Sequence, residues 1–312
     1  HTRYISVTGV QTCALPICYP FIKTEYSRGS RQDRTVRPLV AFQQGRIIAD
    51  LIGGIGASFG LYKEAGALED MRDIPTFDSV PVGMRDEGGL WVGQRLRYWC
   101  MSYNTSLVKA ADLPKTWDDL LANPFWYNGR IAVSDRPNLW LGNVWALPSY
   151  GEAWGKKYIP RLFDDVKPQL RKEGNNAMVA LVIAGEFYAA IPSADYRTKG
   201  YMEKGAPVSW HCPEPVPLSI SEMSMIKGNP HLHAAKLWVN WFLSKEGQLA
   251  QYAVDLAPPV HKDLQTKEFL PFPDEVKGRK IAFRDPIELE RDLPKLFEVW
   301  RSEEHTSELQ SH

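Results

Sequence analysis

The chain has 312 residues, enough for one large domain or two of medium size. Lys plus Arg and Asp plus Glu each number 37, so the net charge is zero and gives no basic excess for binding nucleic acid or an anionic membrane. The 44% hydrophobic share excludes a disordered chain, and no apolar run has the length of a membrane-spanning helix.

The two ends of the chain are related to each other as DNA. One codon choice for Arg301–Ser311, reverse-complemented and shifted by one frame, encodes VTGVQTCALPI, which is Val7–Ile17. We therefore interpret residues 1–18 and 301–312 as translated sequencing adapter and leave them out of the fold prediction. On this interpretation residues 19–300 are a native fragment whose first strand and signal peptide have been cut away.

Short apolar runs alternate with amphipathic segments between the two ends, which indicates an α/β protein. The expected elements, in chain order, are a strand at 21–26, a helix at 30–45 that bends at Pro38 and ends at Gly45, a strand at 47–52, surface loops at 71–93, a strand at 96–104, a short helix opened by the capping box Thr116–Asp119, a strand at 130–135, a helix at 176–184 closed by Gly185, a strand at 186–192, an extended run at 208–217 and an apolar-faced helix at 234–242.

The glycine-rich stretch GGIGASFG (residues 53–60) follows the expected strand at 47–52. It contains G-x-S-x-G around Ser58, the pattern of a hydrolase nucleophile, and a loose dinucleotide-binding pattern that includes Gly54. No native histidine stands in a signature that would complete a serine triad. We favour a loop that faces a ligand at the carboxyl end of a strand, with serine hydrolysis as an alternative.

Two arginines lie at the start of the expected helix at 30–45. Arg28 and Arg31 flank Gly29–Ser30, where their side chains and the helix dipole can together hold an anion. A solvent-exposed helix face is the alternative for both arginines. His231 and His233 are expected to be a surface pair, because no second group of metal ligands lies near them in the sequence.

Several segments together resemble the extracellular solute-binding proteins of ABC transporters, in the branch related to ferric-iron-binding proteins. They are YNTSLV from Tyr103, LPKTWDDLL, GRIAVSD, LVIAGEF, EKGAPVSW, KGNPHLHAAKLWVNWFLSKEGQLAQY and APPVHKDL. The resemblance implies an α/β, two-lobed periplasmic-binding-protein-like (type 2) fold with two hinge crossings. Residues 19–99 plus 215–300 would form lobe 1, and residues 100–214 would form lobe 2.

The resemblance also implies a function without catalysis or a cofactor. The protein would be a monomer in the periplasm, free or lipid-anchored, that captures a small solute such as an organic anion or a sugar in the interdomain cleft. Hinge closure would trap the solute, and a membrane permease would receive it.

The ligand-binding residues implied by the resemblance lie in loops and helix starts, which suit sugars, carboxylates, phosphates or a metal–anion pair. They are Arg28, Ser30, Arg31, Gly54, Ser58, Tyr103, Asn104, Asp135, Arg136, Asn138, Trp140, Asn175, Asn176, Tyr196 and Glu214.

Fe(III) is the alternative cargo. Ferric binders of this family have a tyrosine pair where this chain has Asp195–Tyr196. Carboxylate and phenolate oxygens both suit a hard cation, so Asp195 and Tyr196 are the candidate iron ligands, but the departure from the pair favours an organic or oxyanionic solute.

The resemblance places Cys100 and Cys212 on neighbouring hinge strands. They form either a disulfide that restrains the hinge in an oxidising periplasm or two buried thiols.

Overall fold

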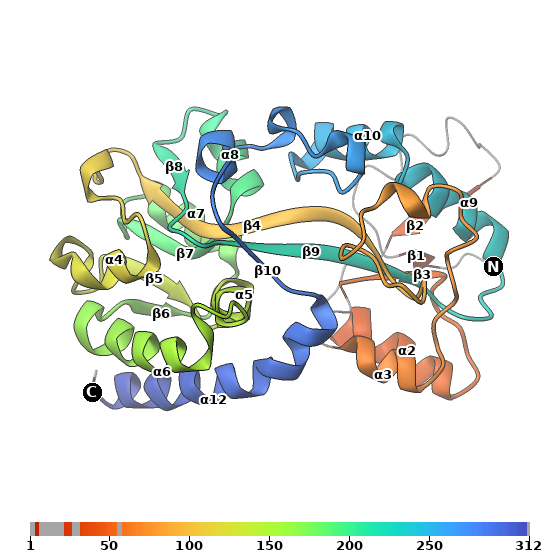
Figure 1. Ribbon diagram of the computed structural model, residues 1–312, viewed down its shortest axis with the longest axis horizontal. Coiled ribbons are helices and arrows are strands. Elements are labelled where there is room, and N and C mark those ends of the chain that lie inside the picture. Colours follow the sequence, from red (N-terminus) through yellow and green to blue (C-terminus); the bar gives the residue numbers. More distant parts are fainter. Residues whose placement is uncertain (1–3, 6–21, 27–31, 55–57, 311–312) are drawn as a thin grey trace. The chain divides into compact units, whose positions relative to one another are not determined.

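The computed structural model describes residues 4–5, 22–26, 32–54 and 58–310 (Figure 1). The chain divides into two compact units: unit 1 holds the described residues up to 96, with 220–269 and 285–287, and unit 2 holds 97–219, 270–284 and those from 288 on. Two long strands, β4 (Val92–Asn104) and β9 (Val216–Met225), each run from one unit into the other. The predicted α/β class and the two-part architecture are confirmed.

Unit 1 combines a short strand pairing with a layer of helices. β3 (Leu51–Gly53) pairs antiparallel with β9, and β1 (Tyr4–Ile5) pairs parallel with β2 (Glu25–Tyr26). Phe59, Tyr62 and Trp91 are fully buried in its apolar cluster. The helices of this unit are η2 (Gln32–Val36), α2 (Arg37–Gln43), α3 (Phe59–Glu64), η4 (Phe77–Ser79), α9 (Leu232–Phe242), α10 (Lys245–Asp255), η9 (Lys262–Leu264) and η10 (Lys267–Phe269).

Unit 2 is built on a sheet with the strand order β10-β9-β4-β7-β5-β6, in which β8 also pairs with β4. The strands are β5 (Ile131–Ser134), β6 (Gln169–Arg171), β7 (Ala189–Ala194), β8 (Val208–His211) and β10 (Ile281–Phe283). The helices are η5 (Ala110–Asp112), α4 (Trp117–Ala122), η6 (Pro124–Trp126), η7 (Pro137–Leu139), α5 (Leu141–Trp145), α6 (Gly151–Arg161), η8 (Leu162–Val166), α7 (Asn175–Ile183), α8 (Asp195–Met202), α11 (Pro273–Val276) and α12 (Pro286–Gln310). No helix in the described part of the chain is both long and apolar enough to cross a membrane.

Local sequence signals account for most of the element boundaries. The capping box is confirmed, because the Asp119 N–H donates to Thr116 Oγ1 at 3.2 Å and the Thr116 N–H donates to Asp119 Oδ2 at 2.8 Å. Gly45 and Gly185 have φ angles of +72° and +82°, the left-handed conformation that ends a helix. Pro38 lies in the first turn of α2, directly after the π-helical η2, so the expected helix at 30–45 changes its geometry next to this proline.

The C-terminal segments pack differently from the expected lobe boundaries. Residues 270–284 and those from 288 on belong to unit 2, whereas we expected all of 215–300 in lobe 1. The cause is tertiary pairing: β10 adds in parallel to the unit 2 part of β9, and α12 packs so closely on Gly142 that a Cβ there would lie 3.0 Å from Leu289 Cδ1. The chain changes units at 96–97 and 219–220, a few residues from the expected boundaries at 99–100 and 214–215. The adapter origin of residues 1–18 and 301–312 stays a sequence-based prediction.

Candidate functional site

One edge of the unit 2 sheet gathers the ends of three parallel strands. β5 pairs in parallel with both β6 and β7, so Ser134, Arg171 and Ala194 end the three strands at the same edge. β4 runs antiparallel to β7 with Trp99 opposite Ala194, and therefore the start of its unit 2 part reaches this edge as well. We call it the carboxyl edge. Open α/β sheets bind ligands at such edges.

The loop after β5 brings three predicted ligand residues to the carboxyl edge. Asp135 follows Ser134 directly, and its N–H donates to the Arg171 carbonyl at 3.1 Å. Arg136 is exposed, with 60% of its side chain accessible and its Nε 3.7 Å from Asp135 Oδ1. Asn138 is half-buried in the same loop. The side chains of this loop can therefore contact a solute.

Two predicted ligand residues have structural roles. Trp140 is fully buried, with its ring centre 4.8 Å from that of Trp117. Asn104 is also buried, and its Nδ2 donates to the Val182 carbonyl at 2.8 Å while its Oδ1 accepts the Ser106 N–H at 2.9 Å. Both side chains make contacts within the unit, although the Trp140 indole N–H has no hydrogen-bond partner, and their contact with a ligand stays a prediction.

Tyr103 and Glu214 lie away from the loops of the carboxyl edge. Tyr103 pairs with Ala189, the first residue of β7, and so lies at the opposite end of that strand from Ala194. Glu214 is half-buried and held through its backbone, since its N–H donates to the Lys115 carbonyl at 2.9 Å. The structure therefore does not bring Tyr103 to the loop after β5, whereas the Glu214 carbonyl accepts the N–H of Trp117, whose ring packs on Trp140 of that loop.

Two helices begin at the carboxyl edge. α8 starts directly after β7, and α7 starts after the turn that follows β6. The first N–H groups of a helix lack partners within it and carry a partial positive charge. The Asn175 Oδ1 at the start of α7 is buried and has no hydrogen-bond partner, while the side chain of Asn176 lies outside the described part. Both helix starts favour a negatively charged group.

Asp195, the first residue of α8, is fully buried, and neither carboxyl oxygen makes a hydrogen bond of ordinary geometry. Burial raises the pKa of Asp195 to about 7, although the nearby N–H groups of Tyr196 and Tyr98 and the charge of Arg97 act to lower it. At pH 7 about half of this carboxyl group is therefore protonated, and below that pH it is mostly uncharged. In the described residues no group of three or more His, Cys, Asp or Glu side chains is placed to hold a metal ion.

Arg97 is a site residue that the sequence did not indicate. Its guanidinium carbon lies 6.0 Å from the centre of the Tyr196 ring, and that of Arg197 lies 5.2 Å from the same ring. Such distances are those of cation–π contacts. Arg97 is opposite Tyr196 because β4 and β7 are antiparallel and Trp99 pairs with Ala194. Only this register, which needs the fold, could have pointed to Arg97.

Three buried hydroxyl groups fix the start of α8. Ser102 on β4 is hydrogen-bonded to Thr198 Oγ1 at 2.6 Å and to Ser193 Oγ on β7. Thr198 also donates to the Ala194 carbonyl at 3.2 Å. The position of Tyr196 is therefore set by two strands and not by a free loop.

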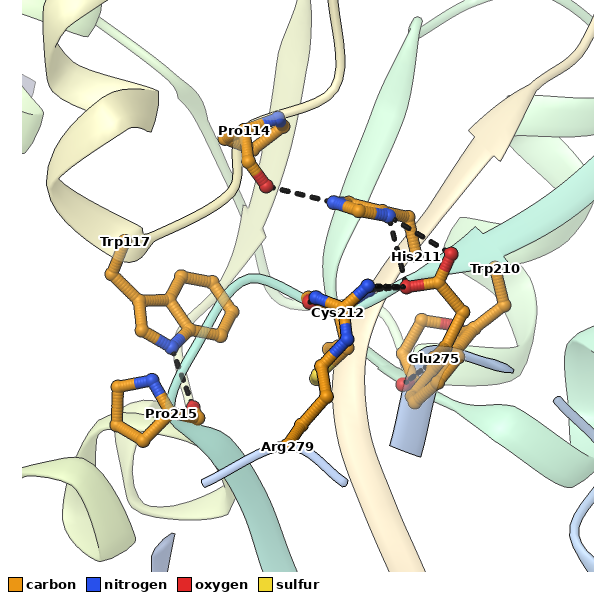
Figure 2. Close-up of a disulfide and its surroundings, with 10 residues drawn as sticks. Pro114, Trp117, Trp210, His211, Cys212, Pro215, Glu275 and Arg279 are labelled. Atoms are coloured by element: carbon orange, nitrogen blue, oxygen red, sulfur yellow. Dashed lines mark hydrogen bonds and ion pairs between the residues drawn. A yellow bond between two sulfur atoms is a disulfide. The ribbon is translucent and has the colours of Figure 1, made fainter. Parts of the chain in front are cut away.

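Cys100 and Cys212 form a disulfide in the structure, with their Cα atoms 5.0 Å apart (Figure 2). His211 beside it contacts two acceptors: Nε2 is 2.7 Å from the Pro114 carbonyl and Nδ1 is 3.0 Å from Glu275 Oε2. Burial alone would raise the pKa of Glu275, but the hydrogen bond and charge of His211 lower it overall. This cluster ties residues 270–284 to the strand next to the disulfide.

The predicted ligand residues of unit 1 are only partly described. Arg28, Ser30 and Arg31 lie outside the described residues. Gly54 is exposed with a φ of +69°, and its N–H donates to the Glu222 carbonyl at 3.0 Å. Ser58 is buried at the start of α3 and makes no hydrogen bond to a histidine within the described part of the chain. A serine triad is not assembled there.

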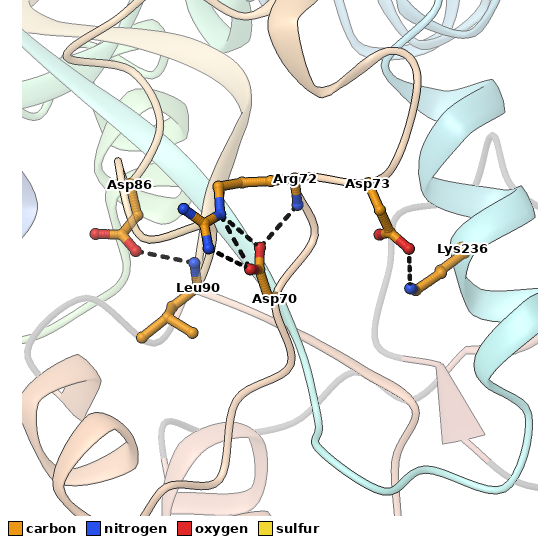
Figure 3. A network of polar contacts seen from close by, with 6 residues as sticks. All are labelled: Asp70, Arg72, Asp73, Asp86, Leu90 and Lys236. Atoms are coloured by element: carbon orange, nitrogen blue, oxygen red, sulfur yellow. Dashed lines mark hydrogen bonds and ion pairs between the residues drawn. The ribbon is translucent and has the colours of Figure 1, made fainter.

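A network of exposed charges stabilises a loop of unit 1 (Figure 3). Asp70 accepts the backbone N–H of Arg72 at 2.9 Å and its Nε at 3.0 Å, and these contacts lower the pKa of Asp70. Asp73 pairs with Lys236. Because each charge is balanced by a neighbour, this network shapes the loop and is a weaker candidate than the carboxyl edge.

Known structures share the fold of this chain. Iron-bound HitA from Pseudomonas aeruginosa is 20% identical with a TM-score of 0.77, covering 96% of this chain and 97% of HitA. The ferric binding protein from Campylobacter jejuni is 15% identical with a TM-score of 0.77, covering 97% and 99%. The periplasmic binding protein AfuA from Actinobacillus pleuropneumoniae, solved with exogenous fructose-6-phosphate, is 20% identical with a TM-score of 0.73, covering 96% and 97%.

Sequence comparison identifies the family. A search of curated proteins gave no match. The profile of the family described as bacterial extracellular solute-binding protein matches residues 47–277, which is most of the chain. The chain therefore belongs to the family of bacterial extracellular solute-binding proteins.

Proposed function

We propose that this protein is the substrate-binding component of an ABC importer in the bacterial periplasm, acting as a monomer that hands a small solute to a membrane permease. Membership of the solute-binding family supports the role in transport. The solute would be an organic anion or a similar oxygen-rich molecule, trapped when the two units close about β4 and β9.

The observation that carries the choice of solute is the chemistry of the carboxyl edge. The starts of α7 and α8, with the partial positive charge of a helix N-terminus, both lie there, and Arg136 adds an exposed guanidinium whose Nε is 3.7 Å from Asp135 Oδ1. An anion at such an edge gains from the helix dipoles and from a charge-assisted hydrogen bond with a guanidinium.

A thermal-shift screen with organic anions, sugars and phosphorylated sugars tests this proposal. A solute at a hundredfold its dissociation constant adds about 2.7 kcal/mol to the free energy of unfolding and so raises the melting temperature by several degrees. Arg136→Gln should weaken the shift, whereas Arg161→Gln, a matched exposed arginine on α6, should not. Small-angle scattering with the best solute should show a smaller radius of gyration. A screen with no shift for any solute would contradict the proposal.

Fe(III) is the second candidate cargo. HitA and the Campylobacter protein, whose names state iron binding, share the fold, and Asp195–Tyr196 would supply two hard oxygen ligands. Burial of Asp195, which disfavours its charged form, and the two guanidinium groups beside Tyr196 both count against a trivalent cation. Addition of ferric citrate should leave the protein colourless. A charge-transfer band that Tyr196→Phe removes would establish iron as the cargo instead.

A further inference from the structure

Arg97 and Arg197 place two positive charges around one aromatic ring. Their guanidinium carbons lie 6.0 and 5.2 Å from the centre of the Tyr196 ring, so the two charges are at most about 11 Å apart. Like charges this close repel each other, and the repulsion falls when an anion sits near both. The side chains come from different elements, β4 and α8, which makes the arrangement a product of the fold.

Neither guanidinium is neutralised by the protein. Within the described residues neither makes an ion pair, in contrast to Arg161, Arg171 and Arg284, which all do. Arg97 Nε is buried and has no hydrogen-bond partner. A buried donor without a partner is costly, which makes it a candidate to be satisfied by a ligand.

The surroundings of the pair are fixed, and the charge of Arg97 also acts on the neighbouring Asp195 carboxyl. α8 is held to β4 and β7 through Thr198 and its hydroxyl contacts, so Tyr196 and Arg197 keep their places at the helix start. The one carboxyl group beside them, Asp195, is fully buried and makes no ion pair among the described residues. The partial positive charge at the start of α8 adds to the positive potential.

We propose that Arg97 and Arg197, positioned by Tyr196, form the subsite that binds one oxyanion group of the solute, a carboxylate or a phosphoryl group. This inference rests on the proposed function and deepens it: Arg97 becomes the residue that selects an anionic solute over a neutral sugar or a metal cation. Because guanidinium groups donate paired hydrogen bonds to planar or tetrahedral oxyanions, both carboxylates and phosphates suit the subsite.

Calorimetry and thermal shift with inorganic phosphate, citrate and a neutral hexose test the subsite in the full chain. Arg97→Gln and Arg197→Gln should each weaken binding of the preferred anion at least tenfold, the usual effect of losing a charge-assisted hydrogen bond. Arg130→Gln is the matched control, because Arg130 also stacks on an aromatic ring of unit 2, 5.1 Å from the centre of Tyr188, and should change the affinity less than twofold.

The outcomes separate the subsite from the general function. The subsite is overturned if the anion binds equally strongly to wild type, Arg97→Gln and Arg130→Gln, although solute binding as such then stands. It is also overturned if the hexose binds and neither anion does. If no solute of any class stabilises the wild type, the proposed function itself fails. If circular dichroism shows that Arg97→Gln does not fold, Arg97→Lys takes its place. Lysine keeps the charge but lacks the two parallel donors of a guanidinium, so the affinity for the anion should still fall several-fold. The affinity of the control variant Arg130→Lys should stay unchanged.

Discussion

Asp195→Asn should remove a pH dependence from the stability of this protein. The Asp195 carboxyl has an ordinary pKa of 3.8 in the unfolded chain, and burial raises it to about 7 in the folded state. Between these values the folded state holds a proton that the unfolded state has released. Raising the pH therefore favours unfolding in this window, and the loss is complete above pH 7.

The size of the effect follows from the separation of the two pKa values. Each unit of separation corresponds to about 1.4 kcal/mol, so ionising a buried Asp195 between pH 5 and pH 8 lowers the free energy of unfolding by about 2–3 kcal/mol. Asparagine has the same shape and carries no charge at any pH. The free energy of unfolding of the variant should consequently not show this loss between pH 5 and pH 8, while the contributions of the other titratable groups stay unchanged.

Urea unfolding followed by tryptophan fluorescence at pH 5, 6, 7 and 8 gives the comparison. Asp70→Asn is the control, because Asp70 is exposed and contacts with Arg72 lower its pKa, so it is ionised throughout this range and its replacement should shift all four values equally. If wild type and Asp195→Asn lose the same stability between pH 5 and pH 8, Asp195 is ionised in the folded state and the assignment of a neutral carboxyl is wrong.

Three further changes test the packing. Replacing Cys100 and Cys212 by alanine opens a loop with a sequence separation of 112 residues and should lower the free energy of unfolding, measured with urea, by about 4–5 kcal/mol. The wild type with reductant should lose the same amount. Gly155→Ala would place a Cβ 2.3 Å from the Trp145 ring and should lower the free energy of unfolding by about 1–3 kcal/mol. In the control Gly200→Ala the new Cβ meets open space, and the melting temperature should rise slightly. Equal effects of the two changes would contradict the packing of α6. Thr116→Ala should cost about 1 kcal/mol by removing the cap of α4, and an unchanged midpoint would show that the cap contributes nothing.

Local signals in the sequence predicted the fold well where a side chain or a glycine decides the outcome within one turn. Thr116 and Asp119 reveal the start of α4, and Gly185 reveals the end of α7, because both effects act over three or four residues. The unit to which residues 270–284 belong depends on the pairing of β10 with β9. No local pattern encodes that pairing, and the expected lobe boundary was therefore misplaced.

The candidate site shows the same division between local and distant information. The loop at Asp135 and the helix start at Asp195 follow predicted strands, so their place at a sheet edge can be inferred from strand prediction alone. The helix start at Asn175 follows β6, a strand that the sequence did not predict. Trp140 stands in the same loop but turns into the core against Trp117, which depends on a partner elsewhere in the chain. Proximity in sequence to a ligand loop is thus weak evidence that a side chain contacts a ligand.

Arg97 illustrates why the most informative residue of the site escaped the sequence. It stands in the middle of a long strand, where an arginine normally indicates nothing more than a solvated face. Its importance comes from the antiparallel register that sets Trp99 opposite Ala194 and from the bonds of Ser102 to α8, which hold Tyr196 in place. Charge selectivity in this protein is consequently a property of strand register: a shift of β4 by one residue would turn the Arg97 side chain to the opposite face of the sheet, and the positive pair at the carboxyl edge would be lost.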